Sequence, residues 1–235
     1  MMSLLKNIQF RNGLYVFLDF LFILIGISLS FQLEERRAQA RKVQLKNQSL
    51  ERILRNLDYD LAEFEVNMEV HEAAAASCFW LFENRHQEEA WHPDSLGYHC
   101  AVCLDGQTIF VDNQEEYLSL RNSGLLAQIE DSALVRLLQE KHIQHQYMHK
   151  IEDYNAELVQ KSRELLFTHF ETRDSLAYAL DFITLRRWNG REVPPSFFEF
   201  AQDISEWHES YLWAMEEQRD ADQHLMRLIQ SEITP

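Results

Sequence analysis

Glycine, proline and cysteine are all scarce in this chain, and each shortage excludes a class of structure. Six glycines and four prolines among 235 residues leave long uninterrupted stretches, which argue against a fold of short strands and tight turns. Three cysteines are too few for a small fold held together by disulfides. The composition therefore predicts helices, and the length leaves room for one soluble domain beside a membrane anchor.

Basic side chains are scarce in the second part of the chain. Residues 1–56 carry nine Lys or Arg and four Asp or Glu, whereas residues 57–235 carry 13 basic and 34 acidic side chains. Such an acidic region repels phosphate groups, so we expect no nucleic-acid partner. The basic residues of the first part are expected to face lipid headgroups.

Long apolar runs are also scarce, with one exception. Leu14–Phe31 has 18 residues, which span about 27 Å as a helix, close to the roughly 30 Å of a bilayer's hydrocarbon core. The run lacks the small-residue cleavage site of a signal peptide. We predict a transmembrane helix over residues 14–33 after a tail of residues 1–13, with membrane lipid as its partner. Flanking basic residues favour the cytoplasmic side for the rest of the chain, but long domains can be exported against such a bias, so the side stays open.

Asp19 is the acid within this run. An ionisable side chain inside a membrane costs several kcal/mol unless it is paired, hydrated or protonated. Asp19 is therefore a candidate for ion coupling, for a hydrogen bond between neighbouring copies, or for a bilayer-edge residue that reaches the headgroups. The variant Asp19→Asn distinguishes ion coupling from the other roles, because unchanged activity and assembly in this variant would exclude ion coupling.

An uninterrupted helix is predicted for residues 34–92. From Leu50 to Phe82 a row of residues recurs at alternating spacings of four and three, as in a coiled coil. The row is apolar up to Met68, and the small or polar members His71, Ala75 and Cys78 indicate closer or different packing there. We call the first part of this row the seam: Leu50, Leu54, Leu57, Leu61, Phe64 and Met68. The seam predicts either a homo-oligomer or packing within one chain against a helix at residues 131–170, since both share this spacing.

Residues 93–113 are predicted to form an irregular loop, because Pro93 and Gly97 interrupt the helical pattern. Cys100 and Cys103 form a CxxC pair that can close a disulfide in an oxidising compartment and leave Cys78 unpaired. Weak candidates for zinc ligands are His99, Cys100 and Cys103. A structural zinc site needs a second ligand pair that the sequence does not show, so we predict no metal and no cofactor.

Residues 114–235 are predicted to form an acidic helical bundle that packs on the long helix. Expected helices are 131–170, with Asp131 or Ser132 as its cap, 174–187, and a last helix capped by Ser196. The predicted fold is therefore all-α: an N-terminal transmembrane helix that continues into a long coiled-coil-like helix, then an elongated helical bundle.

A set of segments carries a resemblance to a known family: Asp19 with Ile25-Gly26-Ile27, then Gln32 and Glu34-Glu35-Arg36-Arg37, and later Tyr117-Leu118-Ser119-Leu120-Arg121-Asn122-Ser123-Gly124-Leu125-Leu126. With these segments the chain resembles, over most of its length, a family of uncharacterised, single-pass, membrane-anchored helical proteins of bacteria. Members often carry Glu in place of Asp19, and a juxtamembrane Trp that this chain lacks. The resemblance implies the cytoplasmic membrane of a bacterium and attaches no activity.

The anchor alone also resembles the acid-bearing transmembrane helix of proton-channel subunits in stator motors. Leu18–Leu24 carries this second resemblance, in which a membrane Asp takes up and releases the driving ion. The downstream domain departs from that family. The resemblance implies an ion-coupled or channel-forming assembly that uses Asp19.

The sequence contains no nucleophile elbow, P-loop or dinucleotide-binding fingerprint. We therefore expect a non-enzymatic single-pass membrane protein, a self-assembling scaffold or an interaction module for an unidentified protein partner. The ion-coupled assembly is the second hypothesis. A metal-dependent enzyme or sensor that uses the His99–Cys103 segment is the third.

Overall fold

The computed structural model describes residues 2–87, 91–111, 113–172, 178–179 and 183–233, except for the side chains of residues 2–16, 19, 161–162, 164–166, 172 and 178–179. The helices are α1 Met2–Glu83, α2 Pro93–Asp105, α3 Glu115–Asn122, the 3₁₀ turn η2 Leu125–Gln128, α4 Ser132–His169 and α5 Pro195–Ile233. The strands are β1 Phe170–Thr172, β2 Tyr178–Ala179, β3 Ile183–Thr184 and β4 Arg186–Trp188. The predicted all-α class is confirmed.

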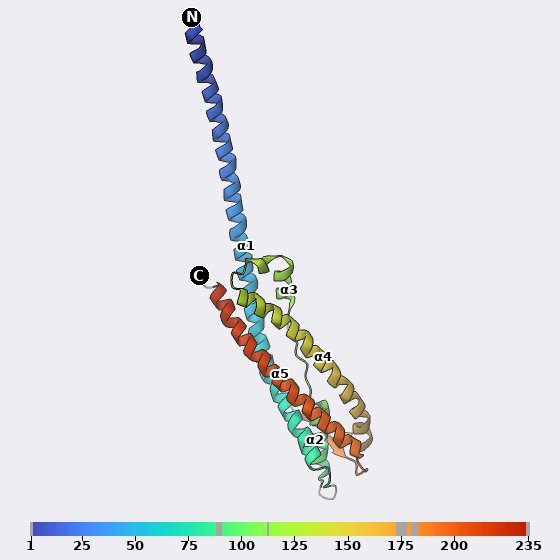
Figure 1. The fold of residues 1–235 in the computed structure, drawn as a ribbon. Coiled ribbons are helices and arrows are strands. Elements are labelled where there is room, and N and C mark those ends of the chain that lie inside the picture. The colour runs from blue at the N-terminus through green and yellow to red at the C-terminus, as the bar shows by residue number, and fades with distance from the viewer. Residues whose placement is uncertain (1, 88–90, 112, 173–177, 180–182, 234–235) are drawn as a thin grey trace.

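Helix α1 is a single rod of 82 residues. At 1.5 Å per residue it is about 120 Å long. Its N-terminal half projects well beyond the rest of the molecule, and its C-terminal half lies inside the bundle (Figure 1). The helix ends at Glu83 rather than at the predicted residue 92. Beyond its end, the indole Nε1 of Trp91 donates to the carbonyl of Asn84 over 2.8 Å and fixes the turn.

Within the described residues, no helix combines the length and the hydropathy that a membrane crossing requires. The side chains of residues 14–16 and Asp19 lie outside the described residues, so the predictions for Leu14–Phe31 and for Asp19 fall partly outside them. The backbone of these residues belongs to α1.

The bundle is built on the C-terminal half of α1, with α5 running alongside it and α4 packed on α5 (Figure 1). Leu50, Leu57 and Phe64 of the seam are fully buried, and Leu54, Leu61 and Met68 pack against the same cores. Their neighbours come from α5 and α4 of the same chain. The seam is therefore packed within one chain, which is one of the two arrangements that its spacing predicts, and the homo-oligomer stays a prediction. Its main partner is α5, and side chains of α4, the predicted helix at 131–170, complete the same cores.

Residues 93–105 form helix α2 and are not part of an irregular loop, which corrects that prediction. Pro93 lies at the start of α2, where its missing N–H costs nothing, and the side chain of His92 accepts the Asp94 N–H. Gly97 also lies within α2. The backbone of β4 approaches it so closely that the Cβ of any other residue would lie 2.0 Å from the Arg186 carbonyl oxygen, so only glycine fits this position. Pro93 and Gly97, which were the reason to predict a loop, are therefore both part of helix α2.

The predicted helix over residues 174–187 is also wrong where the structure describes it. Tyr178–Ala179 pairs with Ile183–Thr184, and Phe170–Thr172 pairs with Arg186–Trp188, both antiparallel. Residues 173–177 and 180–182 lie outside the described residues. The predicted helices before and after this segment are confirmed as α4, whose first turn Asp131 caps by accepting the Ala133 N–H over 2.8 Å, and α5. Helix α5 begins at Pro195, so Ser196 lies in its first turn and is not the predicted cap.

Candidate functional site

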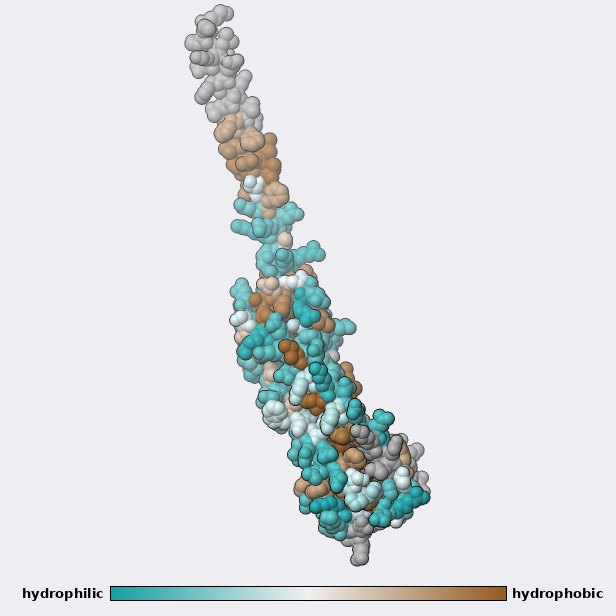
Figure 2. Space-filling model, turned by 45° about the vertical axis from the view of Figure 1, so that its right-hand side comes forward, coloured by the Kyte–Doolittle hydropathy of each residue, from teal (hydrophilic) through white to brown (hydrophobic). Residues whose placement is uncertain are grey.

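A band of exposed apolar side chains surrounds the projecting part of α1. Its large members are between 37 % and 69 % exposed: Phe17, Leu18, Phe20, Leu21, Phe22, Ile23, Leu24, Ile25, Ile27, Leu29, Phe31 and Leu33. Successive helical residues point about 100° apart, so such a run is apolar on every side. Figure 2 shows the band in brown on the projecting helix. The exposed basic residues Arg36, Arg37, Arg41 and Lys42 follow it.

A buried ionic cluster joins the long helices of the bundle. The Nζ atom of Lys141 on α4 lies 2.9 Å from Oδ2 of Asp60 on α1 and 2.8 Å from Oδ2 of Asp222 on α5. Gln218 donates to Oδ1 of Asp222 over 2.8 Å. Burial alone would lower the pKa of Lys141, but the carboxylates of Asp222 and Asp60 hold it above its ordinary value. The cluster is therefore a charged crosslink between the helices.

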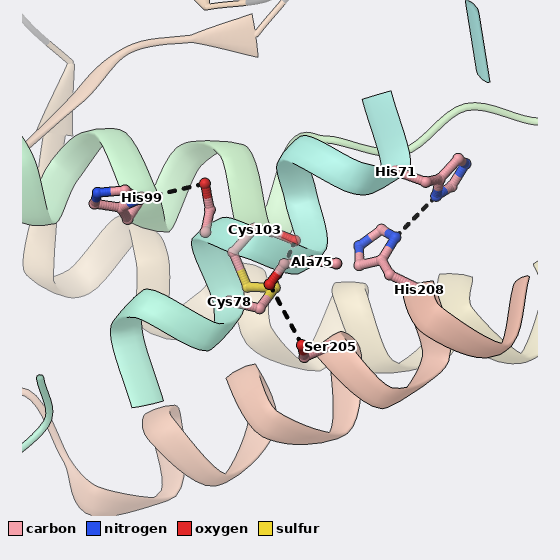
Figure 3. The surroundings of a disulfide bond; sticks show 8 residues. His71, Ala75, Cys78, His99, Cys103, Ser205 and His208 are labelled. Carbon is pink, nitrogen blue, oxygen red and sulfur yellow. Dashed lines mark hydrogen bonds between the residues drawn. A yellow bond between two sulfur atoms is a disulfide. The ribbon is translucent and has the colours of Figure 1, made fainter. Parts of the chain in front are cut away.

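Two histidines meet deeper in the bundle. The Nδ1 atoms of His71 on α1 and His208 on α5 lie 2.8 Å apart, and both side chains are buried (Figure 3). Burial lowers the pKa of both rings, and the charge of His71 would lower that of His208 further. Since one Nδ1 must donate and the other accept, the pair is stable with both rings neutral. The pair links α1 to α5 in the interior, and Nε2 of His71 lies 3.2 Å from the hydroxyl of Thr108.

Glu152 is the acceptor of a second buried network. Its carboxylate accepts the hydroxyl of Tyr211, the backbone N–H of Phe110 at 2.9 Å, and a bond from Nδ1 of His149 at 2.9 Å. Burial, together with the hydrogen bond to Glu152, raises the pKa of Tyr211. This network ties α4 to α5 and to the segment after α2.

The cysteines pair differently from the prediction. Cys78 on α1 forms a disulfide with Cys103 on α2 (Figure 3). Cys100 is a buried free thiol whose pKa is raised by burial. His99 points elsewhere, with Nδ1 3.3 Å from the hydroxyl of Ser77. The weak zinc candidates His99, Cys100 and Cys103 are therefore not brought together. Among the described residues, no group of His, Cys, Asp or Glu is arranged to hold a metal ion.

A solvent-facing groove lies between α4 and α5. Two adjoining hollows of about 340 and 570 Å³ form it, and Tyr147, Trp213 and Ala214 line both. Tyr147 and Trp213 are 55 % and 62 % exposed. Acidic side chains line the groove from both helices: Glu140, Glu206, Glu209 and Glu217. We call this feature the α4/α5 groove.

Sequence patterns missed the buried polar residues. Lys141, Glu152 and His208 lie on amphipathic helices, where a polar residue beside the apolar stripe is normally exposed. His71 is the exception, since it occupies the coiled-coil row in place of an apolar residue, and that position indicated different packing there. No local sequence pattern indicated the groove, because its two walls, α4 and α5, are formed by segments far apart in the chain.

The side chain of Asp19 lies outside the described part of the structure, and the ion-coupled hypothesis remains a prediction from sequence. The exposed apolar band, the buried crosslinks and the α4/α5 groove are the features from which a function can be argued. Comparison with known proteins found no protein family, no curated protein and no solved structure that matches the chain.

Proposed function

We propose that the chain is a non-enzymatic, single-pass membrane protein that holds an acidic interaction module away from the bilayer on a helical stalk. The observation that carries this proposal is the continuity of α1. The same helix presents the exposed apolar band over residues 17–33 and supplies the buried core residues Leu50, Leu57 and Phe64. In this proposal the membrane segment and the stalk of the domain are parts of one continuous helix.

The band has the character of a lipid-facing surface. A helix that is apolar on one stripe packs on a protein, whereas a helix that is apolar all round is buried on all sides. The 18 residues of Leu14–Phe31 span slightly less than the hydrocarbon thickness, and Gln32 and Leu33 extend the span to its edge. The exposed basic residues beyond Leu33 then lie at headgroup depth, where each Lys or Arg near an anionic surface contributes about 1 kcal/mol.

The stalk separates the acidic bundle from the membrane. Residues 34–38 of α1 are exposed, and the bundle begins at Gln39, whose Nε2 donates to Oε1 of Gln128 in η2 over 2.6 Å. From Leu33 to Gln39 the helix rises by about 9 Å. This distance is about one Debye length at physiological ionic strength, so repulsion between the bundle and anionic lipids is partly screened.

The disulfide supports an orientation with the bundle on the oxidising side of the membrane. Cys78 and Cys103 are buried, and their bond joins α1 to α2. Structural disulfides persist in exported compartments and are rare in the reducing cytosol. Basic flanking residues favour the opposite side, but that bias does not control long domains. The disulfide is the stronger argument because it depends on the fold of the domain itself.

The anchor is tested by placing arginine in the band. In Ile23→Arg with Ile25→Arg, the fraction of chain that stays with alkali-washed membranes is expected to fall at least tenfold. Each arginine at the centre of a span costs about 3 kcal/mol. The matched control is Tyr59→Arg with Val66→Arg, at exposed positions of α1 within the bundle, and it should stay in the membrane fraction. An unmodified chain that alkali removes from membranes would refute the anchor.

The orientation is tested by counting thiols. Protein from acid-quenched cells, denatured and treated with a maleimide mass tag, is expected to take one tag per chain before reduction, at Cys100, and three afterwards. Cys100→Ser should take none before reduction and two after it. Three tags without reduction would place the bundle in a reducing compartment. The number of tags reports on the disulfide alone, so the result is valid whether or not the chain is anchored in a membrane.

A further inference from the structure

We propose that the α4/α5 groove binds a basic amphipathic helix of a partner protein. The inference rests on the proposed interaction role of the bundle and names the chemistry of the partner. Three independent features of the groove support it: its length, its exposed aromatic side chains and its charge.

The groove has the dimensions of a helix-binding site. Its α4 wall runs from Leu137 to Ile151 and its α5 wall covers residues 206–225. The α4 wall is about 21 Å long, which is the rise of four helical turns. Amphipathic helices commonly bind such grooves with apolar residues spaced by three and four positions. A partner helix of about 14 residues therefore fills the groove from end to end.

Tyr147 and Trp213 are the expected anchor points. Each is more than half exposed although it is among the larger apolar side chains, and both border the two hollows. Ala214 leaves room between them for a side chain of the partner. Tyr and Trp are the residue types that most often dominate binding energy at interfaces. Their rings also attract the ammonium or guanidinium group of a Lys or Arg.

The charge of the groove selects a basic partner. Glu140, Glu206, Glu209 and Glu217 line its walls, and the one cation among its lining residues, Lys141, is already held by Asp60 and Asp222. Arg136 lies 3.5 Å from Glu140, but this pair is exposed and contributes little. Anionic lipid, nucleic acid and a second acidic bundle are all repelled by such a surface.

The test titrates the full chain in lipid nanodiscs with two designed peptides of 14 residues. Both carry the same leucine stripe, and one has lysine and the other glutamate on the remaining positions. The lysine peptide is expected to bind saturably, with a stoichiometry of one, at least tenfold more tightly than the glutamate peptide, and empty nanodiscs supply the blank. Trp213→Ala should weaken binding at least tenfold, whereas Tyr98→Ala, which removes an exposed aromatic side chain outside the groove, should not.

Charge variants separate groove recognition from general attraction. Glu140→Gln with Glu217→Gln should weaken binding at least threefold, and Glu65→Gln with Glu69→Gln, which removes the same charge from exposed positions of α1, should leave it unchanged. Equal losses for both pairs would overturn the proposal, as would equal binding of both peptides. Self-association that Trp213→Ala abolishes would assign the groove to a second copy instead. A chain that fails to insert into nanodiscs can still be titrated in solution, so failure of the anchor is distinguishable from failure of the groove.

Discussion

Lys141→Met is expected to lower the free energy of unfolding of the bundle by about 3–5 kcal/mol. The substitution removes the ammonium group that lies 2.9 Å from Asp60 and 2.8 Å from Asp222, and it leaves two buried carboxylates facing each other. An uncompensated buried charge is the costly outcome, more so than the absence of the ion pair as such. The measurement is urea unfolding of the full chain in detergent, followed by far-ultraviolet circular dichroism.

Two controls isolate the electrostatic cause. Combining Lys141→Met with Asp60→Asn and Asp222→Asn should recover more than half of the lost stability, because no buried charge is then left unpaired. Lys150→Met, at an exposed position of the same helix, should change the free energy of unfolding by less than about 0.5 kcal/mol. If Lys141→Met alone costs no more than this control, the cluster does not crosslink the helices.

Leu57→Asp is expected to unfold the bundle, with a cost of more than about 4 kcal/mol. Leu57 is fully buried in a core cluster with Leu225 and Ile229 of α5 and Leu134 of α4. Truncating such a leucine costs about 2–5 kcal/mol, and a carboxylate in an apolar site adds its own desolvation. The loss should appear as a drop in the midpoint of thermal unfolding, with no change in the mass of the folded species beforehand.

The same variant distinguishes the two interpretations of the seam. If the seam joined copies of the chain, Leu57→Asp would dissociate an oligomer and leave each chain folded. Tyr59→Asp is the matched control, because it adds the same charge two residues away at a position that is 75 % exposed. That control should cost less than about 1 kcal/mol. An oligomer that falls apart into folded chains would contradict the packing described here.

Helical periodicity was enough to predict the long helices. The row from Leu50 to Phe82, the cap at Asp131 and the apolar stripe of residues 197–229 are local patterns, and α1, α4 and α5 follow them. The partner of the row was not predictable, because coiled coils and bundle cores share one spacing. That α5 supplies more of the seam's contacts than α4 depends on how the chain turns between residues 170 and 195.

Local rules failed where tertiary contacts decide. A proline such as Pro93 can follow the end of one helix or occupy the first turn of the next, and the local sequence does not distinguish the two. The glycine at position 97 is explained only by the close approach of the β4 backbone. Cys100 and Cys103 are close in sequence, yet Cys103 pairs with Cys78, which is 25 residues away, because α2 packs on α1. The buried positions of Lys141 and His208 likewise depend on neighbours from other helices.

The most direct test of the membrane-anchored stalk is protease protection of the full chain in sealed vesicles. Exhaustive digestion is expected to remove the bundle and leave a protected peptide, identified by mass spectrometry, that contains Phe17–Leu33. Opening the vesicles with detergent should abolish protection. Digestion of this segment at the same rate in sealed and in opened vesicles would contradict the account.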